Sequence, residues 1–215
     1  GLDGLKARLE EYAGMGAKFT KWRAVIKIGE GIPSQTCLYS NAEVLARYSA
    51  LAQEAGLVPI IEPEVIRDGV HDLNRCAEVT AQTLKAVFER IAAHKVALEG
   101  LILKTNMATA GEENPNQASP QEVAKVTIDA LLQSVPKELP GIVFLSGGQT
   151  PDMATDNLNA ISQMGGPWQL SFSFARALQD EAMKTWAGKD ENVESAQKAF
   201  SDRAQKVSLA RAGKL

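Results

Sequence analysis

Short runs rich in β-branched and other apolar residues alternate along the whole chain with longer stretches in which apolar residues recur at helical spacing. The short runs predict strands and the longer stretches predict helices. Each strand is separated from the next by enough residues for one crossover helix. Strands are expected at Lys21–Ile28, Leu57–Glu64, Leu98–Asn106, Gly141–Gly148 and Trp168–Phe174.

Capping residues indicate where several of the helices begin and end. Ser40 followed by Glu43 has the spacing of a capping box, and Gly56 can end the same helix in a left-handed conformation. Ser119, with Pro120 and then Glu122, predicts a second helix start. Further helices are expected in the first residues, from Asp72 to about His94, from Thr150-Pro151, over Arg176–Trp186 and over Asn192–Leu209, whereas 110–119 is the most loop-like stretch.

The alternation of strands and helices predicts an α/β protein with a mostly parallel sheet, and no linker divides residues 1–215, so we expect one domain. Five strands suit an open, doubly wound sheet. An eight-stranded barrel requires eight such units and about 250 residues. The count alone therefore favours the open sheet, whereas the polar residues at the strand ends favour the barrel.

Composition narrows the functional classes. The chain has 215 residues, 23 Lys and Arg against 26 Asp and Glu, a net charge of −3 and 45% hydrophobic residues, which is typical of a soluble globular domain. It offers no overall basic field for nucleic acid and no apolar run of about 18 residues for a membrane. Cys37, Cys76, His71 and His94 lack the spacing of metal ligands, so we expect no metal site. Two cysteines cannot form a disulfide framework, so we expect a reducing compartment, with a single disulfide between them as the alternative.

Lys104 is the first candidate for chemistry, because it follows the apolar run Leu101-Ile102-Leu103 at the end of a predicted strand. Burial disfavours the charged form of an amine, and a neutral amine can attack a carbonyl carbon to form a Schiff base. A lysine that reaches out to solvent or forms an ordinary ion pair would show the same pattern.

Two further pairs of charged residues have the same parity on their strands and therefore lie on one face each. Glu62 and Glu64 form a carboxylate pair that could divide the roles of proton donor and ionised partner. Lys21 and Arg23 could bring positive charge to the same strand ends, where Arg23 would attract phosphate. Solvent-exposed strand residues remain an alternative interpretation for both pairs.

The last two predicted strands end in small and basic residues that suit an anion. Ser146, Gly147 and Gly148 precede a helix start, and glycines there allow close approach of backbone amides to a ligand. Ser173 and Arg176 follow the fifth strand and could supply a hydroxyl and a guanidinium. A Gly-Gly pair alone usually marks only a turn, but phosphate sites after the last two strands recur in barrels.

Taken together, the segments FTKWRAVIKIGEG, LVPIIEPEVIRDGVHDL, LEGLILKTNMATAG, GIVFLSGGQT and WQLSFSFARALQ closely resemble class I fructose-bisphosphate aldolase over the whole chain. The resemblance implies a (β/α)8 TIM barrel, of which this chain supplies about five C-terminal βα units. It also implies a Schiff-base lyase that uses no cofactor, in a cytoplasmic homotetramer acting on a phosphorylated sugar. It makes Lys104 the Schiff-base lysine, Glu62 the main acid/base, Glu64 and Lys21 its charge-tuning companions, Arg23 a substrate ligand, and Ser146, Gly147, Gly148, Ser173 and Arg176 the phosphate-binding residues.

The same resemblance implies that three barrel strands, with a catalytic aspartate and a substrate-binding lysine, precede Gly1, and that a tail with a functional tyrosine follows Leu215. We therefore expect little activity from the 215 residues alone. Thr105 stands where the family usually has Pro, and Ala175 where some members have Gly, which could alter the strand ends. Another Schiff-base sugar-phosphate lyase or isomerase, or a non-catalytic sugar-phosphate-binding subunit, are the competing hypotheses.

Overall fold

A single parallel sheet forms the centre of the computed structural model, which describes residues 1–215. The strands lie side by side in chain order, and each pairs only with its sequence neighbours. A doubly wound sheet reverses its strand order at a switch point, so this order excludes that alternative and agrees with consecutive units of a barrel. The strands are β1 (Phe19–Ile26), β2 (Val58–Val65), β3 (Ile102–Thr105), β4 (Gly141–Phe144) and β5 (Gln169–Phe172).

All of the predicted helices are present. They are α1 (Leu5–Gly14), α2 (Gln35–Glu54), α3 (Leu73–Ala93), α4 (Pro120–Ser134), α5 (Pro151–Met164), α6 (Arg176–Trp186) and α7 (Val193–Arg211), with short 3₁₀ turns η1 (Leu98–Gly100) and η2 (Asp190–Asn192). The side chains of Asp72 and Thr150 cap α3 and α5 as expected. Ser119 and Glu122 form the full reciprocal capping box of α4.

The predicted start of α2 is wrong by more than one turn. Ser34, not Ser40, is the N-cap, and its hydroxyl accepts a hydrogen bond from the amide of Cys37. The helix extends this far because the added turn buries Leu38 against the core. At the other end Gly56 adopts φ 73°, the left-handed conformation expected after the helix.

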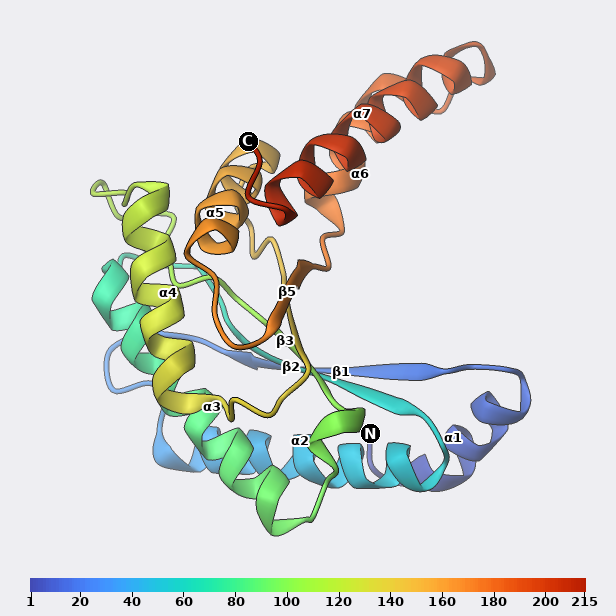
Figure 1. Ribbon diagram of the computed structural model, residues 1–215, viewed down its shortest axis with the longest axis vertical. Coiled ribbons are helices and arrows are strands. Elements are labelled where there is room, and N and C mark those ends of the chain that lie inside the picture. The colour runs from blue at the N-terminus through green and yellow to red at the C-terminus, as the bar shows by residue number, and fades with distance from the viewer.

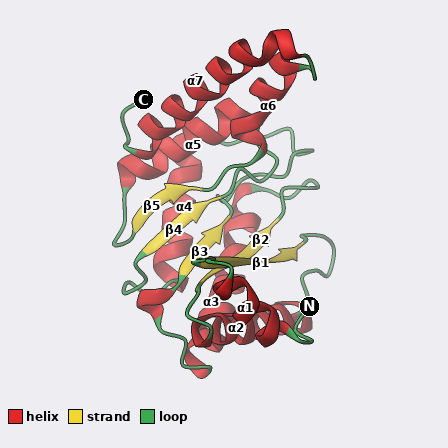
Figure 2. Cartoon of the chain, turned by 90° about the vertical axis from the view of Figure 1, so that its right-hand side faces the viewer, coloured by secondary structure: helices red, strands yellow, loops and turns green.

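The helices α2, α3, α4 and α5 follow one another around the outside of the sheet, each packed against the next (Figure 2). Alternate strand residues point toward them and are fully or almost fully buried, among them Ile26, Ile61, Leu103 and Phe144. The sheet curls, so that β1 and β5 run in very different directions (Figure 1). Its other face carries the charged residues of the candidate site.

The last two helices form a hairpin that projects away from the sheet beyond the end of β5 (Figure 1). The C-terminus then returns to α5, where the amide of Leu215 donates to the side-chain oxygen of Asn159. None of the helices has the length and apolar character needed to cross a membrane.

Candidate active site

The face of the sheet turned away from the helices collects five charged side chains. On β1, Trp22, Ala24 and Ile26 turn toward the helices, so Lys21 and Arg23 lie on the opposite face. Arg23 is in register with Glu62 on β2. The pairing of β2 with β3 reaches Ile61 and Leu103, and one further step along both strands places Glu62 beside Lys104.

Lys104, Glu62 and Lys21 form a three-member ion cluster. Lys104 Nζ lies 2.9 Å from Glu62 Oε1, and Lys21 Nζ lies 2.8 Å from Glu62 Oε2. The side chain of Lys104 is 15% exposed and that of Glu62 is 4% exposed, whereas Lys21 is 44% exposed. Glu62 Oε2 has no hydrogen bond of good geometry, so its contact with Lys21 is an ion pair only. An amine and a carboxylate held this close and largely out of water can exchange a proton directly.

Glu64 has a cation of its own. Arg23 Nε donates to Glu64 Oε2 at 2.5 Å, and this hydrogen bond is the main cause that raises the pKa of Arg23 above its ordinary value. The two carboxylates therefore lie on one face, as the spacing predicts, and have separate cationic partners. The guanidinium of Arg23 is half-exposed, and only its Nε is paired with Glu64. The whole cluster holds three cations against two carboxylates.

A polar cavity of about 270 Å³ lies between the loop and first turn that begin α5 and one face of α6. None of its eight lining residues is hydrophobic; they are Ser146, Gly148, Gln149, Thr150, Pro151, Arg176, Asp180 and Lys184. Amides at helix N-termini and an adjacent guanidinium are groups that bind anions. The structure thus brings Ser146, Gly148 and Arg176 together, as predicted.

The loop that leads into this cavity depends on its glycines. Gly147 and Gly148 have φ values of 55° and 79°, which other residues rarely adopt. Behind the loop, the Gln149 side chain donates to the carbonyl oxygen of Ser146 at 2.9 Å, and buried Asn157 donates to Gln149 Oε1 at 2.6 Å. These two amides hold the loop against α5.

The lining of the cavity differs from the predicted phosphate-binding set. Gly147 and Ser173 do not line the cavity, although Gly147 shapes its loop and Ser173 directly follows β5. Gln149, Thr150 and Pro151, and on α6 Asp180 and Lys184, do line it and were not predicted. The spacing of Asp180 and Lys184, four and eight residues after Arg176, puts all three on one face of α6, and that signal was available in the sequence.

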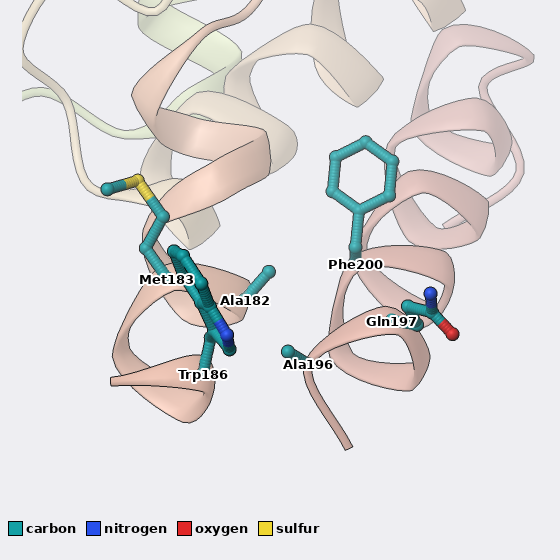
Figure 3. Close-up of a pocket in the computed structure, with 6 residues that line it drawn as sticks. All are labelled: Ala182, Met183, Trp186, Ala196, Gln197 and Phe200. Carbon is teal, nitrogen blue, oxygen red and sulfur yellow. The ribbon is translucent and has the colours of Figure 1, made fainter. Parts of the chain in front are cut away.

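A second cavity, of about 330 Å³, lies apart from these charged groups between α6 and α7 (Figure 3). Trp186 and Met183 project from α6 and Phe200 from α7, and the lining contains no titratable group, so this cavity offers no acid, base or nucleophile. Elsewhere both cysteines are free thiols, and no group of three or more His, Cys, Asp or Glu residues is placed to hold a metal ion.

Comparison with known proteins identifies the family. The family model described as fructose-bisphosphate aldolase class-I matches residues 1–215. This chain belongs to the class I fructose-bisphosphate aldolase family. A probable class 1 aldolase of Xanthomonas axonopodis pv. citri is 54% identical over 217 residues, and the cytosolic fructose-bisphosphate aldolase 4 of Arabidopsis thaliana is 50% identical over 215. These matches cover 100% and 99% of this chain but only 65% and 55% of those relatives.

A solved aldolase structure confirms the fold class. The fructose-bisphosphate aldolase of Plasmodium falciparum, crystallised with TRAP and a small-molecule inhibitor, superposes with a TM-score of 0.97 at 45% identity. The match covers all of this chain and 62% of that one. The five βα units are therefore part of a (β/α)8-barrel fold of the aldolase family. Thr105, one of the two departures from the family pattern, is fully buried and its hydroxyl has no hydrogen-bond partner.

Proposed function

We propose that the protein containing this chain is a class I fructose-bisphosphate aldolase. It reversibly cleaves fructose 1,6-bisphosphate into dihydroxyacetone phosphate and glyceraldehyde 3-phosphate through a Schiff base on Lys104. The observation that carries the proposal is the largely buried Lys104 amine, 2.9 Å from the buried Glu62 carboxylate. Its membership of the aldolase family supports the choice of substrate.

Glu62 acts as the proton carrier of Schiff-base formation. It takes a proton from the Lys104 ammonium, and the neutral amine then adds to the ketose carbonyl carbon. The protonated Glu62 returns the proton to the hydroxyl of the resulting carbinolamine, which leaves as water, and the imine forms. Lys21 Nζ lies 2.8 Å from the second oxygen of Glu62 and is the electrostatic partner of that carboxylate.

The protonated imine then withdraws the electron pair of the adjacent carbon–carbon bond. The hydroxyl on the departing fragment gives its proton to the ionised Glu62 carboxylate and becomes the aldehyde, the electrons of the broken bond are stored as an enamine on the lysine, and Glu62 can later return the proton to the enamine carbon. Protonation of the enamine carbon and addition of water release the second triose phosphate and free Lys104. The positive charge of the cluster, three cations against two carboxylates, suits this anionic substrate.

The cavity between α5 and α6 holds one phosphate of the substrate. Ser146, Gly148 and Arg176 line it, and Ser173 extends the same strand-end loop region. Arg23, whose Nε contacts Glu64, contributes its remaining nitrogens to substrate binding. Fixing the phosphate in this way converts binding energy far from the reacting carbons into alignment of those carbons with Lys104.

The wider assignments follow the same proposal. Residues 1–215 act as one folding unit, and the complete protein works as a cytoplasmic homotetramer. The names of the cytosolic plant relatives support the compartment. Sedimentation of the purified protein would reveal the assembly.

Reductive trapping tests the proposal directly. The complete protein that contains this chain is incubated with fructose 1,6-bisphosphate and sodium borohydride, and the labelled lysine is located by peptide mass mapping. We expect one adduct, on Lys104, which the Lys104→Met variant loses. The Lys125→Met variant is the control, because Lys125 is an exposed lysine on α4 and should not affect labelling.

Two results would overturn the proposal. Binding of the bisphosphate without any adduct would indicate a non-catalytic sugar-phosphate-binding subunit or an isomerase that uses carboxylates alone. Labelling spread over surface lysines, and unchanged in the Lys104→Met variant, would remove Lys104 from the reaction.

A further inference from the structure

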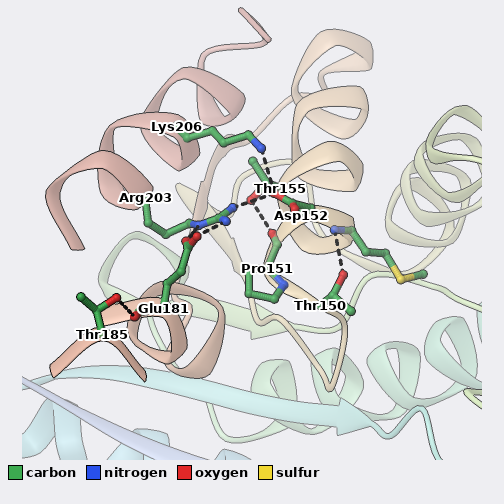
Figure 4. A network of polar contacts seen from close by, with 9 residues as sticks. Thr150, Pro151, Asp152, Thr155, Glu181, Thr185, Arg203 and Lys206 are labelled. Atoms are coloured by element: carbon green, nitrogen blue, oxygen red, sulfur yellow. Dashed lines mark hydrogen bonds and ion pairs between the residues drawn. The ribbon is translucent and has the colours of Figure 1, made fainter. Parts of the chain in front are cut away.

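A buried arginine lies behind the phosphate cavity, outside the residues that touch it. The Arg203 side chain on α7 is 8% exposed and contacts α5 and α6, the two helices that line the cavity (Figure 4). Its Nη1 donates to Asp152 Oδ1 on α5 at 3.0 Å, and its Nε donates to Glu181 Oε2 on α6 at 2.9 Å. Lys206, one turn further along α7, also donates to Asp152 at 2.8 Å.

Both carboxylates are immediate neighbours of residues that line the cavity. Asp152 follows Pro151 in the first turn of α5, and Glu181 follows Asp180 on α6. Arg176 and Lys184 line the cavity from the same face of α6 as Asp180. The positions of Asp152 and Glu181 therefore determine how far apart the two walls of the cavity stand.

We propose that Arg203 is a positioning residue of the phosphate site, which holds the first turn of α5 and the middle of α6 at the separation that one phosphate needs. This inference rests on the proposed function, because it assumes that the cavity binds the phosphate of the substrate. A planar guanidinium can contact two carboxylates in fixed directions at once, whereas an ammonium is a single point charge. The bridge is thus specific to arginine.

Burial strengthens the bridge. Arg203 is shielded from water, whereas Asp152 and Glu181 are 65% and 55% exposed, so water screens the bridge from the carboxylate side only. The hydrogen bonds from Lys206 and Arg203 hold the pKa of Asp152 below its ordinary value, so this carboxylate stays ionised at neutral pH.

The test compares Arg203→Lys and Glu181→Gln with a control on the same helix. Arg203→Lys keeps the charge but not the two-point contact, and Glu181→Gln weakens the α6 side at a residue whose side chain is 55% exposed. Lys198→Ala breaks an exposed pair with Asp202 on α7 and leaves the bridge intact. Two quantities are measured for each chain: the affinity for inorganic phosphate, and the amide chemical shifts of Gly148 and Arg176.

We expect both bridge variants to bind phosphate roughly tenfold more weakly and to shift the two amides, because displacements of about 1 Å in a binding site have large effects. The Lys198→Ala variant should match the unmodified chain. Unshifted amides and unchanged phosphate affinity in both bridge variants would refute the positioning role while leaving the proposed function standing. A further outcome is that the unmodified protein does not bind phosphate while the bridge variants still shift the Gly148 and Arg176 amides. That result would support the positioning role of Arg203 and contradict the assignment of the cavity as a phosphate site.

Discussion

The ion cluster around Glu62 allows a quantitative prediction for the Lys104→Met variant. Removal of the only partner of a buried ion pair typically costs about 3–5 kcal/mol, because the remaining charge is left without compensation. Glu62 is 4% exposed, but it retains Lys21 at 2.8 Å after the change. Since one of its two cations remains, we expect about half of that loss, roughly 2 kcal/mol of the free energy of unfolding. Methionine fills a similar volume, so the cavity left behind is small.

Urea denaturation followed by tryptophan fluorescence measures this loss. For a chain of 215 residues, roughly 2 kcal/mol corresponds to a decrease in Tm of about 4–8 °C. The same substitution at Lys125, whose ion pair with Asp129 is exposed, is the matched control and should cost less than about 0.5 kcal/mol.

A double-mutant cycle with Glu62→Gln isolates the interaction between the two side chains. Because Lys104 and Glu62 are in contact, the two changes should not be additive, with a coupling of about 1–2 kcal/mol. Additive effects, or a Lys104→Met cost as small as that of the control, would show that the cluster does not stabilise the buried carboxylate. The physical basis of its proton exchange would then be lost as well.

Three further predictions concern other parts of the chain. Burial raises the pKa of Tyr48 to about 12, so the contribution of its protonated form to stability should be complete below pH about 10 and be lost as the pH rises from there toward 12. Phenolate absorbance measures the ionisation, and a result in which all tyrosines ionise together near pH about 10 in the folded protein would contradict this prediction. The hydrogen bonds from the Ser119 side chain and amide lower the pKa of Glu122, so Ser119→Ala should decrease Tm at neutral pH, and the difference should shrink as acid protonates Glu122 below pH about 4; a difference independent of pH would argue against the capping box. Asn157→Leu leaves the side-chain oxygen of Gln149 buried without its hydrogen-bond donor, so it should lower the free energy of unfolding by about 1–3 kcal/mol in urea denaturation and weaken phosphate binding. Unchanged stability and phosphate affinity would show that the loop does not need this support.

Much of the fold and part of the site follow from local patterns. Strand and helix periods predicted all five strands and seven helices, although the 3₁₀ turn η1 occupies the start of the predicted strand Leu98–Asn106, and the caps Asp72, Ser119 and Thr150 identified their helix starts. The period of two along a strand places Glu62 and Glu64 on one face. These features depend on residues within a few positions of one another, so the sequence alone determines them.

Other features were decided only by the tertiary structure. The order of the strands settled the choice between an open sheet and a barrel, and burial of Leu38 moved the start of α2 to Ser34. The partners of Glu62 and the bridge from Arg203 to α5 and α6 join residues that are far apart in the chain. Such contacts depend on how the strands align and how the helices pack, and local spacing carries no information about either. For this protein, the sequence by itself therefore specified which groups are available for chemistry, and packing decided which of them meet.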